Sequence, residues 1–186
     1  RDPRALGRLI SWAENDPQRH DELMGAVAAA AVRAGGRVIP VLGVTGTGGA
    51  GKSSLTDELI RRIRLDQDDA LRIAVISIDP SRRKSGGALL GDRIRMNAIG
   101  PWRAANNEDD GARVFMRSLA TRNASATGGS EISQALPVVL IACKAAGFDL
   151  IVVETSGIGQ GDAAIVPLVD VPVYVMTPEF GAASQL

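Results

Sequence analysis

The sequence has one cysteine, Cys143, and one histidine, His20, among its 186 residues. A lone cysteine excludes a disulfide bond within the chain. Cys143 lies in an apolar stretch with a helical pattern, which indicates a small core residue. His20 lies in a polar stretch far along the chain from the motifs described below, so a surface role is predicted for it. We therefore expect neither residue to take part in catalysis.

An excess of charge is also absent, because Lys plus Arg and Asp plus Glu number 21 each. No net basic field therefore favours a nucleic acid partner. The sequence has neither an apolar run long enough to cross a membrane nor a signal peptide, so we expect no membrane partner and a cytoplasmic location. Aromatic residues make up only 3% of the chain although 45% is hydrophobic, which predicts a core of Val, Ile, Leu and Ala.

The length is that of one domain, with an appended element before it. Residues 1–37 are predicted to form a peripheral helical lead-in, with a start signal at Asp16-Pro17 and a stop signal at Gly35-Gly36. Residues 38–186 are predicted to form the main domain. Because the chain does not begin with Met and its last residues resemble an unfinished element, we expect a piece of a longer protein.

Residues 46–53 match the phosphate-binding loop pattern G-x-x-x-x-G-K-S without a mismatch. An apolar run at 38–44 precedes them and a helical pattern at 54–64 follows, which is the strand, loop and helix order that such a loop requires. Glycines let backbone N–H groups point at a phosphate chain, and the helix start adds further N–H groups. The alternative is a glycine-rich turn between a strand and a helix. The predicted nucleotide-binding residues of this segment are Gly48, Gly49, Ala50, Gly51, Lys52, Ser53 and Ser54.

Further apolar stretches predict the remaining strands of a sheet. They are residues 72–78, 113–119, 150–153 and 170–176. Residues 132–146 predict a helix, in which Pro137 requires either a start near Leu136 or a kink. Because strands alternate with helices, we predict an α/β fold of the P-loop NTPase type, with a mostly parallel sheet and helices on both faces.

Acidic residues follow two of the predicted strands directly. Ligands of parallel sheets bind beyond the carboxyl ends of the strands, so we expect Asp79, Glu154 and the loop at 46–53 to share one edge. Mg²⁺ prefers oxygen ligands and keeps several waters, which makes the Ser53 hydroxyl and these two carboxylates candidate ligands. The alternatives are a turn cap at Glu154 and a plain Asp-Pro-Ser turn at Asp79.

Residues 154–157, Glu-Thr-Ser-Gly, resemble the D-x-x-G switch of GTPases, with Glu in place of Asp. In such a switch the backbone N–H of the glycine, here Gly157, senses the γ-phosphate, and loss of this contact on hydrolysis releases the loop. The alternative is an ordinary glycine-rich turn.

Four segments together resemble the MeaB family, the GTPase chaperones of cobalamin-dependent mutases. They are residues 46–53, 79–81, 91–96 and 154–160, in that order. Details at 118–125 and 174–182 are most similar to the G domain of fused isobutyryl-CoA mutases, which is a SIMIBI-class domain. The resemblance implies a Mg²⁺ site that is surrounded by Ser53, Asp79, Asp92, Glu154 and Thr155. It also implies that Arg95 approaches the phosphates. The family's guanine-reading N-K-x-D motif is expected beyond Leu186.

The resemblance implies a GTP hydrolase that gates the loading or protection of adenosylcobalamin in an acyl-CoA mutase. GTP or GDP and Mg²⁺ would bind to this chain, whereas cobalamin would bind to partner domains of the same polypeptide, and the full protein would be a homodimer. The predicted catalytic residues are Lys52, Glu154 and Gln160, the last as a candidate for orienting water. The alternatives are a regulatory module that binds GTP with incidental hydrolysis, and a P-loop kinase or ATPase.

Overall fold

The fold is described from a computed structural model of the chain. The described residues are 2–33, 35–80, 96–99, 113–121, 134–157 and 164–177. Three predicted site residues, Asp92, Arg95 and Gln160, lie outside them. No helix among the described residues is both long enough and apolar enough to cross a bilayer.

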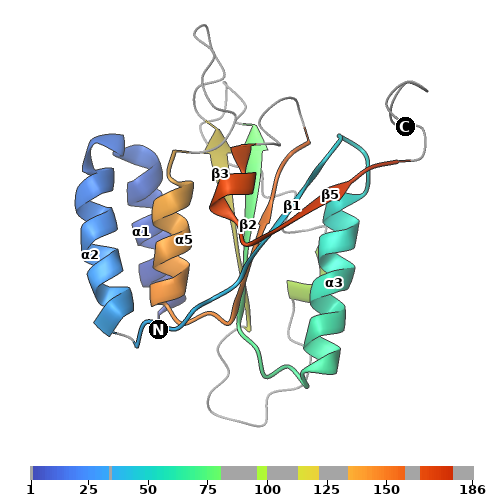
Figure 1. Ribbon diagram of the computed structural model, residues 1–186, viewed down its shortest axis with the longest axis horizontal. Coiled ribbons are helices and arrows are strands. Elements are labelled where there is room, and N and C mark those ends of the chain that lie inside the picture. Colours follow the sequence, from blue (N-terminus) through green and yellow to red (C-terminus); the bar gives the residue numbers. More distant parts are fainter. Residues whose placement is uncertain are drawn as a thin grey trace, which may run out of the picture.

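A five-stranded sheet forms the centre of the molecule, and every pair of neighbouring strands is parallel (Figure 1). The strand order across the sheet is β3-β2-β4-β1-β5. The strands are β1 (Val41–Gly46), β2 (Ile73–Pro80), β3 (Val114–Thr121), β4 (Leu150–Glu154) and β5 (Val171–Val175). The predicted α/β class is therefore confirmed, and the described sheet is entirely parallel.

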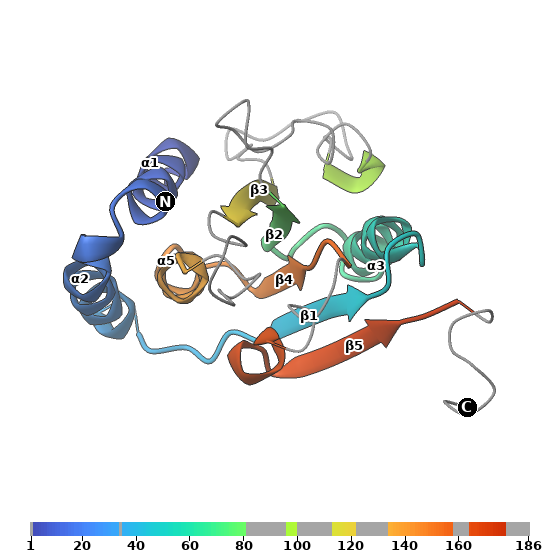
Figure 2. The ribbon, with the colours of Figure 1, turned by 90° about the horizontal axis from the view of Figure 1, so that it is seen from above.

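Helices cover both faces of this sheet (Figure 2). The helix α3 (Lys52–Asp66) lies on one face, and α5 (Leu136–Ala145) lies on the other with α1 (Pro3–Asn15) and α2 (His20–Arg33) beside it. Short 3₁₀ turns are η1 (Pro17–Arg19), η2 (Asn97–Ile99) and η3 (Val166–Leu168). Each face has its own apolar cluster, because a sheet between two helical layers must bury both of its surfaces.

Prolines set three of the element boundaries. The strand predicted at 38–44 is shifted along the chain. It begins only after Pro40, because proline has no N–H to donate to the sheet, and β1 then continues to Gly46. At Pro137 the helix starts at Leu136 and does not kink, because the first turn does not use the N–H that proline lacks. Pro17 begins a 3₁₀ turn, and the α-helix itself begins at His20.

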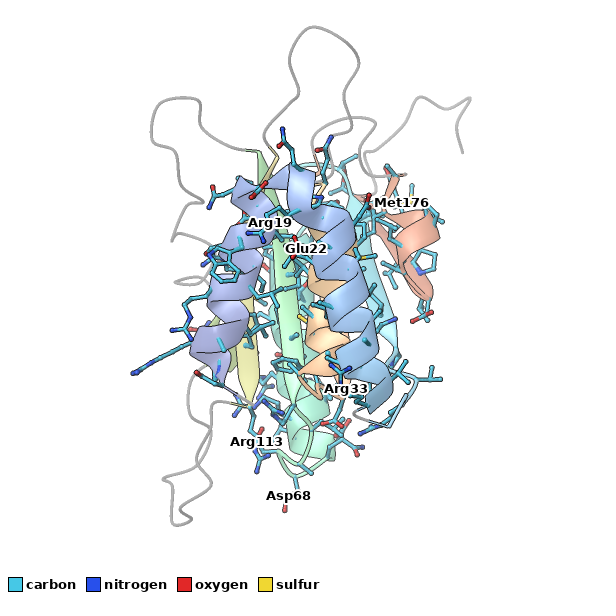
Figure 3. The ribbon with its side chains drawn as sticks, turned by 90° about the vertical axis from the view of Figure 1, so that its left-hand side faces the viewer. Arg19, Glu22, Arg33, Asp68, Arg113 and Met176 are labelled. Carbon is cyan, nitrogen blue, oxygen red and sulfur yellow. The ribbon has the colours of Figure 1, made fainter. Side chains whose placement is uncertain are left out.

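The N-terminal helices pack closely onto the main domain. Leu6, Ile10 and Ala13, on one face of α1, are buried in the same cluster as the apolar side of α5. Figure 3 shows α1 and α2 from outside, with the exposed ion pair between Arg19 and Glu22 (Nε to Oε2, 3.1 Å) at the turn that joins them. The lead-in is therefore attached to the domain through the hydrophobic core.

Cys143 is fully buried on α5, as predicted for a core residue. Burial raises the pKa of its thiol to about 12, because the thiolate would lose its hydration in this apolar environment.

Candidate functional site

The phosphate-binding loop joins the carboxyl end of β1 to the start of α3, as the sequence predicts. Gly46 passes so close to β5 that a Cβ at this position would lie 1.9 Å from the carbonyl oxygen of Val175. Gly51 caps the amino end of α3 with a positive φ of 90°. The loop therefore turns tightly over the helix start, where helical N–H groups and the helix dipole favour an anion.

Lys52 lies inside this loop with only 6% of its surface exposed. Its Nζ donates hydrogen bonds to the carbonyl oxygens of Gly46 at 2.9 Å and Thr47 at 2.8 Å. A buried ammonium group must have such acceptors to offset its lost hydration. They hold the positive charge at the loop, where a phosphate oxygen is a suitable further acceptor.

Ser53 and Glu154 meet across the carboxyl edge of the sheet. The Ser53 hydroxyl donates a short hydrogen bond to Oε1 of Glu154, although 101 residues separate them in the chain. Glu154 is 6% exposed and lies at the end of β4, in register with Val44 of β1. A hydroxyl and a carboxylate are the hard oxygen ligands that Mg²⁺ prefers, so these two residues fit the predicted metal site.

Asp79 belongs to the same edge by its place in the sheet. Ser77 of β2 is in register with Glu154, which puts Asp79 two residues further along β2 toward the carboxyl end. The predicted convergence of Asp79, Glu154 and the loop on one edge therefore agrees with the strand order. Within the described part of the chain, which excludes the side chain of Asp79, no three His, Cys, Asp or Glu side chains cluster as a metal site.

Thr155 is buried next to Glu154, with 5% of its surface exposed. Its hydroxyl donates a hydrogen bond of 3.1 Å to the hydroxyl of Thr45, and its N–H donates to the carbonyl oxygen of Val44 at 3.0 Å. Thr155 thus joins the ends of β4 and β1, and its role as a metal ligand stays a prediction.

Gly157 lies directly against the phosphate-binding loop. Its φ is +76°, and a Cβ on it would lie 2.1 Å from Nζ of Lys52, 2.5 Å from the carbonyl oxygen of Gly46 and 2.8 Å from the N of Gly48. The segment after β4 therefore reaches the loop that is predicted to hold the phosphates. This closeness is what the predicted role of Gly157 as a γ-phosphate sensor requires.

Four residues around α3 form a cluster that the sequence reasoning missed. They are Asp57, Arg64, Asp69 and Ala98, which are joined by hydrogen bonds between α3, the turn after it and η2. One available signal is the spacing of Asp57 and Arg64, seven residues apart and so on one face of the helix.

The exposed side of α3 has a separate charge cluster. The guanidinium groups of Arg61 and Arg62 hydrogen-bond to Glu58 and lower the pKa of its carboxyl group to about 2. This cluster is exposed to solvent and has no contact with Lys52 or Ser53 among the interactions described.

Comparison with known protein families gives a match over nearly the whole chain. The sequence model of the MeaB family, described as methylmalonyl-CoA mutase-associated GTPase, matches residues 6–186. The GTPase ArgK of Escherichia coli is 34% identical over 169 residues, covering 89% of this chain and 45% of that protein. A crystal structure described as LAO/AO transport system kinase superposes with a TM-score of 0.59 at 25% identity, covering 94% of this chain and 45% of that one.

Longer relatives are more similar in sequence. The fused isobutyryl-CoA mutase of Cupriavidus metallidurans is 69% identical over 185 residues, which cover 100% of this chain and 15% of that protein. The protein of the same name from Geobacillus kaustophilus is 51% identical over 188 residues, covering 100% of this chain and 16% of that protein. The chain thus spans a small part of these relatives.

Proposed function

This chain belongs to the MeaB family of methylmalonyl-CoA mutase-associated GTPases, and on this premise we propose that it binds Mg²⁺ and GTP at residues 46–53 and hydrolyses the nucleotide. The observation that most strongly supports the proposal is the meeting of Lys52, Ser53 and Glu154 at the carboxyl edge of the sheet. These side chains provide a cation for phosphate oxygens and two oxygen ligands for a divalent metal. Gly157 adds a backbone group at the same place.

In the proposed reaction, a water oxygen forms a bond to the γ-phosphorus while the bond from that phosphorus to the β–γ bridging oxygen breaks. The products are GDP, inorganic phosphate and a proton. Lys52 stabilises the negative charge that develops on the phosphate oxygens, together with the loop N–H groups. Bound Mg²⁺, held by Ser53, Glu154 and the predicted ligands Asp79, Asp92 and Thr155, would supply further charge neutralisation. Gln160 is proposed to orient the water.

We further propose that GTP turnover gates the loading or protection of adenosylcobalamin in an acyl-CoA mutase. The support comes from the relatives, since two fused isobutyryl-CoA mutases contain a segment similar to this chain. Cobalamin-binding and mutase domains of the same polypeptide are the proposed partners, in a cytoplasmic homodimer.

A nucleotide-binding experiment tests the proposal. Calorimetric titration of the natural full-length protein should show tight binding of GTP in the presence of Mg²⁺, weaker binding of ATP, and a loss of Mg²⁺ dependence in Ser53→Ala. Ser53→Thr is the matched control, because threonine keeps the hydroxyl and occurs at this position of the loop pattern. Equal affinity for ATP and GTP, or an unchanged Mg²⁺ requirement in Ser53→Ala, contradicts the proposal.

A second candidate is a regulatory module in which GTP binding alone changes the contacts of the domain. The contact between Gly157 and the loop favours it, because a phosphate bound there would press directly on the segment after β4. Mutase activity measured with GTP and with a non-hydrolysable analogue separates the two candidates. Full activity with the analogue supports binding alone, whereas arrest with the analogue supports turnover.

A further inference from the structure

A cavity of about 460 Å³ lies at the amino end of the sheet, where β2, β3 and β4 begin. Its lining includes three arginines, Arg37, Arg72 and Arg113, and a single acidic residue, Asp149. Figure 3 labels Arg113 at this end of the molecule. The strand β2 is 8 residues long, which at about 3.3 Å per residue puts roughly 25 Å between this end and the carboxyl edge of the sheet. The cavity is therefore separate from the candidate nucleotide site.

Two of these arginines lie side by side. Ile73 and Val114, the first residues of β2 and β3, are partners in the parallel ladder, and the N–H of Ile73 donates to the carbonyl oxygen of Arg113 at 2.8 Å. Arg72 and Arg113 directly precede these partners, so their backbones are about 5 Å apart, the spacing of neighbouring strands. Like charges at paired positions of a sheet repel each other and are destabilising. An anion bound next to both side chains would remove this cost.

The other charged groups of the lining have partners that hold them in place. Nη1 of Arg72 donates to two carbonyl oxygens at the end of α5, at 3.2 and 3.3 Å, and its guanidinium carbon lies 4.9 Å from the centre of the Phe148 ring. Nη1 of Arg37 donates to Oδ1 of Asp149 at 2.7 Å, and Oδ2 of Asp149 accepts from the backbone N–H of Arg72 at 2.8 Å. Both oxygens of the acidic group are therefore engaged by residues other than Arg113.

Arg113 is the arginine that these contacts leave unexplained. It is half-buried, and its side chain has neither a hydrogen bond nor an ion pair within the part of the chain that the structure describes. Contact with the end of α5 accounts for Arg72, and the pair with Asp149 accounts for Arg37. Neither explains a second cation beside Arg72. A guanidinium group binds carboxylate or phosphate oxygens through two parallel hydrogen bonds, which makes an oxyanion the fitting partner for Arg113.

We propose that this cavity binds a small, multiply charged organic anion with phosphate or carboxylate groups. Arg113 and the neighbouring Arg72 provide the positive charge, and the exposed Arg37 adds to it. The volume lies within the range of about 300–1,000 Å³ that is typical of small-molecule sites, which favours such a ligand over a segment of a partner protein. The site goes beyond the proposed GTPase function and does not depend on it, so either can fail without the other.

Calorimetric titration of the natural full-length protein with two probes tests the proposal, at low salt and without Mg²⁺ or nucleotide. Inorganic pyrophosphate represents phosphorylated ligands and citrate represents polycarboxylates, so the two titrations identify which group is preferred. Arg113→Gln should weaken binding by roughly 10-fold, because a charged hydrogen bond is lost, and Arg113→Lys should retain part of the affinity. Arg8→Gln is the matched control, since Arg8 is an exposed cation on α1 that does not line the cavity.

The phosphate-binding loop could also take up pyrophosphate, so both titrations are repeated with Lys52→Ala. Binding of either probe that persists in Lys52→Ala and is weakened in Arg113→Gln supports the proposal. Three results overturn it: no binding of either probe, equal binding in Arg113→Gln and the parent, or binding that is lost in Lys52→Ala alone.

Two further measurements separate the proposal from its rivals. Without added anion, Arg113→Gln should unfold at the parental temperature or above it, because the repulsion from Arg72 is lost. A lower unfolding temperature together with unchanged probe binding assigns Arg113 a structural role and overturns the proposal. The chain also has three consecutive acidic residues at 108–110. Probe binding that appears only in the variant Glu108→Gln/Asp109→Asn/Asp110→Asn would mean that carboxylates of the chain itself occupy the cavity, which overturns an external ligand.

Discussion

Substitution of Gly157 by alanine tests the contact between the segment after β4 and the phosphate-binding loop. The added Cβ would lie 2.1 Å from Nζ of Lys52 and 2.5 Å from the carbonyl oxygen of Gly46. The lysine side chain could move aside. The carbonyl oxygen of Gly46 could not, because it belongs to the backbone, and Gly46 itself lies close against the backbone of Val175. In addition, a left-handed φ of +76° costs a residue with a Cβ about 1–2 kcal/mol. The segment must therefore move away from the loop.

The expected effect on catalysis is much larger than the effect on stability. A displacement on the order of 1 Å in an active site can lower the rate about 100-fold, so we expect Gly157→Ala to reduce GTP hydrolysis by at least roughly 10-fold. Its free energy of unfolding should fall by about 1–2 kcal/mol, the cost of the left-handed backbone. Phosphate release and denaturant unfolding measure the two quantities.

Gly36 is the matched control. Its φ is +58°, and a Cβ on it would meet nothing within 4 Å, so Gly36→Ala has the backbone cost without the clash. We expect it to lose similar stability and to hydrolyse GTP at the parental rate. Parental hydrolysis by Gly157→Ala, with its stability lowered as in Gly36→Ala, would refute the proposed contact.

Three further predictions follow from contacts outside the site. Glu14→Ala should lower the free energy of unfolding, measured by urea denaturation, by about 1–3 kcal/mol. The reason is that the Glu14 carboxylate accepts a hydrogen bond from the N–H of Ala120 at 3.1 Å and pairs with Arg117 at 3.2 Å. Glu14→Gln should retain most of the stability. Cys143 should resist alkylation in the native protein and react in denaturant. The pKa of its thiol in the folded protein, about 12, lies above the value of 9.0 for a free thiol. The contribution of the buried thiol to the free energy of unfolding is therefore fully present below about pH 9 and is lost as the pH rises toward 12. The ion pairs of Glu58, with a pKa of about 2, should contribute above about pH 4.5 and weaken as the pH falls toward 2, which titration by NMR would follow.

The site was predictable from the sequence where local rules determine geometry. The strand, loop and helix around residues 46–53 follow from one contiguous motif, and the common edge of Asp79 and Glu154 follows from the direction of parallel strands. The hydrogen bond between Ser53 and Glu154 could not be derived in this way, because it depends on how far α3 lies from β4.

Other features depend on packing between distant segments. The lead-in was expected to be peripheral, yet the spacing of Leu6, Ile10 and Ala13 by four and three residues already indicates one buried helix face. The link from Arg64 to Ala98 joins residues 34 apart and has no local signal at all. A buried hydrogen bond of this kind becomes visible only when the helix and the turn are placed together.

The most direct test is the rate of phosphate release from GTP by the natural full-length protein and by Lys52→Ala. Lys52 is buried in the loop and held by two carbonyl oxygens, and loss of a charged hydrogen-bond donor in such a place is equivalent to at least about a 10-fold fall in rate. Lys144→Ala, in the last turn of α5 far from the loop, is the control and should keep the parental rate. A large loss in Lys52→Ala alone is the predicted result, and equal rates in Lys52→Ala and the parent would contradict a GTPase site at residues 46–53.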